Sequence, residues 1–348
     1  MIFEEKKLSF VHKVLFPKTM LFGEKGEALL KTLYTGQIYL FISESFYKTH
    51  LNDSWINGKF LGKVVYSKEP TKEDIDDFAK EIKKAKPRFV TAIGGGSVMD
   101  LAKLSRGREN ITFIVMPTTL GSGAEVSQHA VFTDKGAKKS LSSALFLPDL
   151  VIVNPKHFDS LTREQIVLQS IDGVAHALES LVSKMSHQFS DDFALRAIQI
   201  FHCSFRDLQA GKDIRDEVSN FHRASILSGL AQSSVGVGLA HALAHVLGPL
   251  AGIPHAEAVA MFLFDVLEIN LRQTGVYKKM YSATGISFED FLDGLRFFYQ
   301  KMEPRRLVLK KDQDIKELAQ KVRREVNFFT NPYLPNISEI IGIIEKHL

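Results

Sequence analysis

The chain of 348 residues has one cysteine, one tryptophan and a net charge of only +4. Because Cys203 stands alone, no intrachain disulfide and no cysteine-paired metal motif can form. The 44 lysine and arginine residues are scattered and nearly balanced by 40 aspartate and glutamate residues. The composition therefore predicts a globular protein of a reducing compartment, and it argues against nucleic acid as a partner.

An export signal and a membrane-spanning run are also missing. The first ten residues alternate charged and single apolar residues, without the apolar stretch of a signal peptide. Residues 224–256 contain no lysine, arginine or acidic residue, but their serines, histidines, glycines and prolines make them too polar and too broken to face lipid. We therefore expect a cytoplasmic protein that does not bind a membrane and has a buried polar site within 224–256.

The residue pattern changes near residue 155. Before that point, short β-rich runs alternate with helical spacing, which is typical of a parallel sheet with crossover helices. The runs lie at 38–42, 89–93, 111–116 and 150–153, and helical spacing at 71–86 predicts one βαβ unit over 38–93. Beyond it, helical periodicity dominates at 163–184, 191–208, 216–233 and 239–247. We predict an α/β domain over 1–155 and an all-α domain over 156–348.

A glycine-rich turn follows the predicted strand 89–93. Gly94, Gly95 and Gly96 allow the backbone to approach a pyrophosphate closely, and the helix that starts near Ser97 offers free N–H groups. Asp100 follows one turn later. The motif matches neither of the common nucleotide-binding glycine patterns, so a tight turn without a ligand explains it equally well when it is taken alone.

A hydroxyl-rich loop follows the next predicted strand, 111–116. Thr118, Thr119 and Ser122 could bind a ribose or a base, although each could equally be an ordinary helix cap. Two neighbouring loops at the carboxyl ends of strands form the usual ligand rim of an open α/β sheet. Together the loops predict a Rossmann-like nucleotide site.

Histidines are concentrated in the stretch without formal charges. Three of the twelve lie within 241–255, where even spacing predicts about 0.5. His241 and His245 share a helix face, His255 begins the next helix, and Asp172 and His176 repeat the four-residue spacing upstream. A carboxylate with several imidazoles suits Fe(II), Zn(II), Ni(II) or Co(II), with one position left open for a substrate oxygen. Singly, each histidine is better explained as a buried, hydrogen-bonded residue, but together they predict a metal site.

In this order and spacing, the motifs resemble those of the iron-containing (group III) alcohol dehydrogenase family, which has the dehydroquinate synthase-like fold. The resemblance covers nearly the whole chain and includes GGGSVMDLAK, PTTLGSGAE, PDLVIVNP, SIDGVAHALES and GLAHALAHVLGPLAGIPH. It implies a metal-dependent, NAD(P)-linked oxidoreductase that interconverts an alcohol and an aldehyde or ketone. It also implies a small-molecule substrate and a homodimer.

The resemblance further implies roles for single residues. By position, Asp172, His176, His241 and His255 would bind one divalent metal, and His245 would be the catalytic residue beside nicotinamide and substrate. The expected cofactor-binding residues are Gly95, Gly96, Ser97, Asp100, Thr118, Thr119, Ser122 and Lys139, the last at the nicotinamide ribose. Glu44 stands where NAD-preferring members carry an acid. A carboxylate there accepts hydrogen bonds from the ribose and repels a 2′-phosphate, so we expect NAD rather than NADP.

Two alternatives remain at this point. Residues 255–260 also resemble dehydroquinate synthases, so a cyclase or lyase with tightly held, recycled NAD is the second candidate, although Asp172, His176 and the threonine loop favour the dehydrogenases. A metal-free nucleotide-binding relative would require an incomplete ligand set, and the set is complete. Arg305, Arg306, Lys310 and Lys311 could bind an anionic substrate, but a solvated charged surface explains them better.

Overall fold

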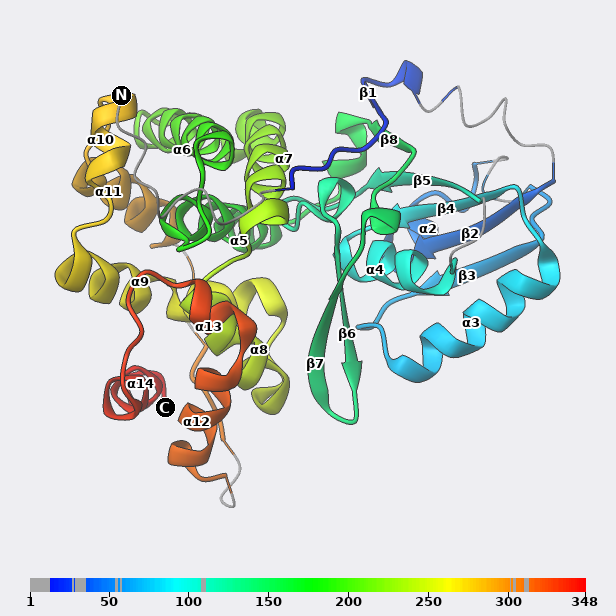
Figure 1. The fold of residues 1–348 in the computed structure, drawn as a ribbon. Helices are drawn as coiled ribbons and strands as arrows, with labels where there is room; N and C mark the ends of the chain where they lie inside the picture. Colours follow the sequence, from blue (N-terminus) through cyan, green and yellow to red (C-terminus); the bar gives the residue numbers. More distant parts are fainter. Residues whose placement is uncertain are drawn as a thin grey trace.

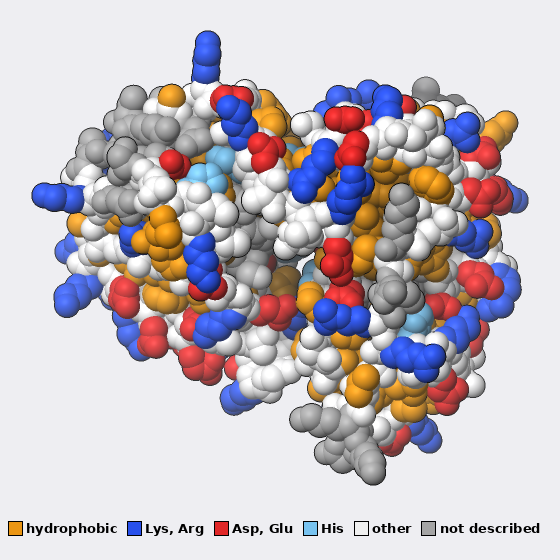
Figure 2. Space-filling model, turned by 180° about the vertical axis from the view of Figure 1, so that it is seen from behind, with side chains coloured by type: hydrophobic (Ala, Val, Ile, Leu, Met, Phe, Trp, Pro, Cys, Tyr) orange, Lys and Arg blue, Asp and Glu red, His pale blue; other side chains and the backbone are white. Residues whose placement is uncertain are grey.

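The computed structural model describes residues 13–26, 28, 36–53, 56, 58–107, 111–300, 302, 305–309 and 313–348. Lys310 and Lys311 lie outside these residues. The chain forms two lobes, an α/β lobe followed by a helical lobe (Figure 1). Seen from behind, the surface is hollowed where the lobes meet, and charged side chains of both signs lie along the edge of the hollow (Figure 2).

A six-stranded parallel sheet forms the centre of the first lobe, in the order β1-β8-β5-β4-β2-β3. Side chains on both faces of β2 are buried, Tyr39 and Phe41 in one hydrophobic cluster and Leu40 and Ile42 in another. Burial on both faces explains the continuous apolar runs of the inner strands. The strands are β1 (Thr19–Phe22), β2 (Ile38–Ser43), β3 (Gly62–Tyr66), β4 (Phe89–Gly94), β5 (Thr112–Pro117) and β8 (Leu150–Val153).

The prediction of a single βαβ unit over 38–93 was wrong because it missed one strand, β3. β3 lies between the predicted strand and helix, and it pairs with β2 at the edge of the sheet. Its sequence GKVVY alternates exposed and less exposed side chains, so it lacks the apolar run by which the inner strands were recognised. The helices of this lobe are α2 (Glu44–Thr49), α3 (Lys72–Ala85) and α4 (Gly96–Ser105).

A β-hairpin of β6 (His129–Asp134) and β7 (Ala137–Ser142) lies between the lobes (Figure 1). Its turn places Lys135 and Gly136 at positive φ, 50° and 78°, as a tight hairpin turn requires. β6 packs against α4, and β7 packs against α8 (Leu239–Ala251) of the helical lobe. The hairpin was not predicted from the sequence, and it connects the sheet lobe to the helix that carries two of the clustered histidines.

The second lobe is helical, as predicted. α5 is buried along most of its length because α6, α7 and α9 pack around it, which suits a helix that is apolar on most faces. Its helices are α5 (Arg163–Val182), α6 (Gln188–Gln209), α7 (Val218–Val235), α8, α9 (His255–Thr274), α10 (Lys278–Thr284), α11 (Phe288–Tyr299), α12 (Ile315–Arg324), α13 (Val326–Thr330) and α14 (Ile337–Glu345).

Within the part of the chain that the structure describes, no single helix has the length and apolarity to cross a membrane. Residues 214–235 and α8 satisfy that test only as a pair, and the two are bent by 95° relative to each other.

Candidate metal and cofactor site

Three helices bring the four predicted metal ligands together. Asp172 and His176 lie one turn apart on α5, His241 lies on α8, and His255 is the first residue of α9. The Oδ1 atom of Asp172 lies 3.9 Å from Nε2 of His176, 3.4 Å from Nε2 of His241 and 3.8 Å from Nε2 of His255. Asp172, His176 and His241 thus offer ligand atoms that lie within 4.8 Å of one another, and Nε2 of His255 approaches this group at Asp172.

The unsatisfied atoms of this cluster fit a divalent cation. Oδ1 of Asp172 and Nε2 of His241 are buried and have no hydrogen-bond partner among the described residues, although buried polar atoms are normally paired. Burial raises the pKa of Asp172, but His176, His241 and His255 outweigh it and hold the pKa below the usual value. The carboxylate is therefore ionised, as a metal ligand must be.

Hydrogen bonds from outside the cluster orient the imidazoles. Nδ1 of His176 donates to the carbonyl oxygen of Gly121 at 3.1 Å, and Nδ1 of His241 lies 2.6 Å from Oε2 of Glu179. Each bond leaves Nε2 facing Asp172. Such partners fix the ring orientation and the tautomer of a metal-binding histidine.

Glu179 was missed by the sequence analysis. Its carboxylate also accepts the backbone N–H groups of Gly238 at 2.9 Å and Ala240 at 2.7 Å, so it caps the start of α8 while it orients His241. The spacing from Asp172 and His176, seven and three residues, places Glu179 on their face of α5. That spacing was the available signal.

The histidines differ in their affinity for protons. Burial lowers the pKa of His241, but Glu179 and Asp172 outweigh it and raise the pKa to about 9. Burial lowers the pKa of His255 well below its usual value, and Asp172 offsets this only in part. A metal that binds here must displace a proton from His241, so metal affinity will depend on pH.

His245 lies beside the cluster but outside it. It follows His241 by one turn of α8, and the centre of its ring lies 5.4 Å from that of His255. Its Nδ1 lies 3.7 Å from Oε2 of Glu325 and 3.4 Å from Nδ2 of Asn327. The last two residues come from the junction of α12 and α13, and no motif or periodicity marked them in the sequence.

The glycine turn and the threonine loop meet, as predicted. Gly95 caps α4, and no side chain caps that helix start. A Cβ added at Gly95 would lie 2.8 Å from Oγ1 of Thr119, and one at Gly96 would lie 3.3 Å from Cβ of Ser122. The amides at Gly96 and Ser97 therefore open a helix whose N-terminus can receive an anion.

The threonine loop is also held against the helical lobe. The backbone N–H of Leu120 donates to Oε1 of Gln169 on α5 at 2.9 Å. On the sheet side, the amide of Thr118 donates to the carbonyl oxygen of Gly94, the last residue of β4, at 3.0 Å. At Gly121, where φ is +88°, an added Cβ would lie 1.8 Å from the carbonyl oxygen of Gln169. The loop that carries Thr118, Thr119 and Ser122 is thus seated on α5, the helix of two metal ligands.

Asp100 makes contacts within the chain. Its Oδ1 lies 3.2 Å from Nζ of the buried Lys103, and its Oδ2 accepts the backbone N–H of Val131 at 3.0 Å. Burial raises the pKa of Asp100, and Lys103 opposes that rise. The residue joins α4 to the β6–β7 hairpin.

The two adjacent lysines of β7 lie in different surroundings. The side chain of Lys139 is 53% exposed and pairs with Asp134, whereas that of Lys138 is 7% exposed and pairs with Glu69 at 2.9 Å. Burial lowers the pKa of both His245 and His255, and the charge of Lys138 adds to this lowering. Successive side chains of a strand point to opposite faces. Lys138 is therefore the lysine on the histidine side of β7.

Glu44 opens α2 directly after β2, the strand that pairs with β4 and its glycine turn. Its carboxylate lies 2.9 Å from Nζ of Lys48, and this pairing lowers the pKa of Glu44. The side chain is partly exposed at the carboxyl edge of the sheet.

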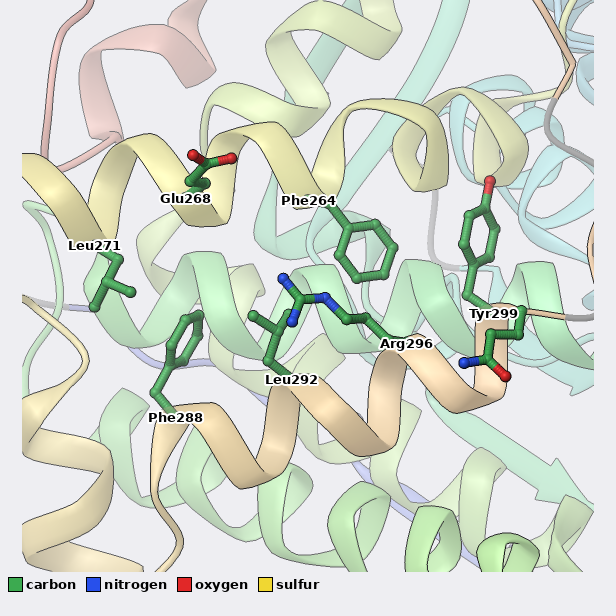
Figure 3. A pocket seen from close by; sticks show the side chains of 8 residues that line it. Phe264, Glu268, Leu271, Phe288, Leu292, Arg296 and Tyr299 are labelled. Carbon is green, nitrogen blue, oxygen red and sulfur yellow. The ribbon is translucent and has the colours of Figure 1, made fainter.

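A separate cavity of about 520 Å³ lies between α9 and α11 (Figure 3). Its lining on α9 begins at Phe264, nine residues after His255, which corresponds to roughly 14 Å along the helix axis. It is therefore distinct from the histidine cluster. The lining residues are Phe264, Glu268, Leu271, Phe288, Leu292, Arg296, Tyr299 and Gln300.

Comparison with known proteins identifies the family of the chain. Residues 40–155 match the family model of iron-containing alcohol dehydrogenase, and residues 166–348 match the C-terminal model of the Fe-containing alcohol dehydrogenase family. The chain is 33% identical over 219 residues to a 1-propanol dehydrogenase of Citrobacter freundii. That match covers 61% of this chain and 59% of the relative, so the chain matches about three fifths of the relative's length.

Solved structures show the same fold. The iron-containing alcohol dehydrogenase from Thermococcus thioreducens has a TM-score of 0.82 at 21% identity, over 96% of this chain and 99% of that one. The sulfoacetaldehyde reductase from Bifidobacterium kashiwanohense, solved in complex with NAD+, has a TM-score of 0.82 at 22% identity, over 97% and 99%. The predicted fold, an α/β lobe with a parallel sheet followed by a helical lobe, is confirmed, and it is the fold of these solved structures.

Proposed function

Because the chain belongs to the iron-containing alcohol dehydrogenase family, we propose that it is a metal-dependent oxidoreductase that interconverts a small alcohol and its aldehyde or ketone. The observation that supports this most directly is the cluster of unpaired ligand atoms around Asp172. The cyclase alternative is not favoured, since the matching family is one of dehydrogenases.

The metal ligands in this proposal are Asp172, His176, His241 and His255. One carboxylate and three imidazoles suit Fe(II) or Zn(II), and also Ni(II) or Co(II). A divalent ion bound there supplies a Lewis acid for the substrate oxygen and stabilises negative charge that develops on it. Gly121 and Glu179 hold two of the imidazoles in the required tautomer.

The cofactor in this proposal is NAD. Gly95, Gly96 and Ser97 bind the pyrophosphate at the start of α4, and Thr118, Thr119 and Ser122 line the adenosine side. Glu44 accepts the ribose hydroxyls and disfavours the 2′-phosphate of NADP. Lys138, rather than Lys139, extends toward the nicotinamide ribose, and Asp100 positions the hairpin that carries it.

His245 transfers the proton between the substrate oxygen and solvent. Its ring lies beside His255 and, unlike His176, His241 and His255, it makes no ion pair with Asp172 among the described residues. Its Nδ1 faces Glu325 and Asn327, which leaves Nε2 free for the proton transfer. An imidazole suits this task near neutral pH.

The assembly and location of the protein follow the family in this proposal. We expect a cytoplasmic homodimer with a small-molecule substrate and without nucleic acid or membrane as partner. Sedimentation of the purified protein tests the dimer. By name, one similar protein acts on uncharged 1-propanol and another on negatively charged sulfoacetaldehyde. The charge of this protein's substrate therefore has to be inferred from the residues of its own site.

Elemental analysis of the purified protein tests the proposal, combined with NADH consumption against small aldehydes before and after chelation and metal add-back. We expect about one metal per chain and NADH oxidation that is lost with the chelator and restored with the metal. Bound metal without net NADH turnover would support the cyclase alternative, and a chain that binds no metal would reject both.

A further inference from the structure

The junction of α12 and α13 places a carboxylate beside His245. Glu325 is the single residue between the two helices, and its extended backbone, φ −65° and ψ 139°, breaks the helical path. Both helices pack against α8, the helix of His245. Oε2 of Glu325 lies 3.7 Å from Nδ1 of His245, and the side chain remains 25% exposed. The carboxylate is thus at the site and still reachable from solvent.

Two basic side chains of this region, Lys138 and Arg305, are paired with carboxylates other than Glu325. Lys138, whose charge acts on His245 and His255, lies 2.9 Å from Oε1 of Glu69. Arg305, part of the basic cluster noted in the sequence, lies 3.1 Å from Oε1 of Glu257. Among the described residues, the only ion-pair partner found for Glu325 is His245. No lysine or arginine in the described part of the chain thus forms an ion pair with Glu325 that would neutralise its charge.

We propose that Glu325 makes this site select uncharged alcohols and aldehydes over those that carry a carboxylate or sulfonate. The inference rests on the proposed function, because it assumes that the substrate oxygen lies at the Asp172 cluster next to His245. An anionic group at the far end of a four-carbon substrate would then approach Glu325. Like charges a few ångströms apart in a partly buried site repel strongly enough to lower kcat/KM by about tenfold or more.

A matched pair of alcohols tests the selection. 4-Hydroxybutanamide and 4-hydroxybutanoate have nearly the same shape and differ in charge. For the metal-loaded enzyme with NAD, we expect kcat/KM to favour the amide at least about tenfold. Glu325→Gln should reduce this ratio about tenfold, and Glu325→Lys should shift it further toward the carboxylate. Glu317→Gln, which removes an exposed carboxylate from α12, is the control and should leave the ratio unchanged.

Two results would overturn the inference. Wild-type preference for the carboxylate would show that basic groups of the chain, rather than Glu325, determine the substrate class. An unchanged ratio in the folded Glu325→Gln variant would show that this carboxylate does not face the substrate. Calorimetric binding of the two compounds to the metal-loaded protein with NAD gives the same ratio without turnover. If no alcohol is oxidised, the proposed function fails, whereas the selection by charge is still read from this binding ratio.

Discussion

Replacement of Glu179 by glutamine tests the link between helix capping and metal binding. The wild-type carboxylate accepts three hydrogen bonds, with His241 and Gly238 on Oε2 and Ala240 on Oε1. A glutamine side chain has one oxygen acceptor. In either orientation, its amide N–H₂ group must therefore face at least one of these donors.

The expected loss in the free energy of unfolding follows from these three donors and the single acceptor of glutamine. A buried donor without an acceptor costs about 1–3 kcal/mol, and each hydrogen bond that loses its charged acceptor weakens by roughly 1 kcal/mol. The sum, about 3–5 kcal/mol, is a large share of the stability of a typical protein, about 5–15 kcal/mol. Since Glu179 also orients His241, metal affinity should fall by about 10–100-fold.

Urea unfolding of the metal-free protein and competition with a metal chelator measure these two effects. Glu217→Gln is the matched control, because Glu217 is also buried in the helical lobe and accepts hydrogen bonds from Ser204 and Asn220. We expect the control to lose stability but to keep its metal affinity. If the two variants bind metal equally well, the reasoning about Glu179 is refuted.

Four further predictions can be checked with point variants. His245→Gln should lower kcat by about 100-fold or more with unchanged metal content, and loss of the metal would contradict the proton-transfer role. Lys138→Met should raise the KM for NAD more than Lys139→Met does, and the reverse order would contradict the assignment of the two faces of β7. Gly121→Ala should destabilise the protein by at least about 3 kcal/mol in urea unfolding, because a Cβ there meets a backbone oxygen of α5 at positive φ. Burial, aided by Lys103, lowers the pKa of His129 to about 4. As the pH falls below about 6.5, His129 is protonated in the unfolded chain but not yet in the folded protein. The contribution of His129 to the free energy of unfolding is therefore highest above that pH and decreases as the pH falls toward 4. His129→Gln should therefore reduce the loss of stability between pH 7 and 4.5 by about 2 kcal/mol, discounted because the ring is partly exposed. Parallel pH profiles of variant and wild type would contradict this.

The sequence was informative where a pattern repeats locally. The inner strands have apolar runs because both faces are buried, and the spacing of Asp172 from His176 and of His241 from His245 follows from one helical turn. The fold class was therefore predictable from local patterns, whereas the choice of Asp172, His176, His241 and His255 as one ligand set came from the family resemblance.

The remaining features depend on contacts between distant parts of the chain. Which of Lys138 and Lys139 faces the histidines depends on the register of the β6–β7 hairpin, and no apolar pattern in the sequence predicted that hairpin. Glu325 reaches His245 from 80 positions further along the chain, through the packing of α12 and α13 on α8. Glu179 lay in a recognised helix, but its role emerged only with the position of α8.

The seat of the threonine loop on α5 has a consequence for recombining such proteins. The sheet lobe ends near β8, but residues 117–123 fit the helical lobe at backbone level, with Gly121 against Gln169 and Gly123 against Gly229. A chimera with its crossover near residue 155 would contain the threonine loop of one parent and the α5 and α7 surfaces of the other. The loop would then lose the surface that it packs against, although the crossover lies between secondary-structure elements. The unit that can be transplanted intact is the sheet lobe together with the matching surfaces of α5 and α7.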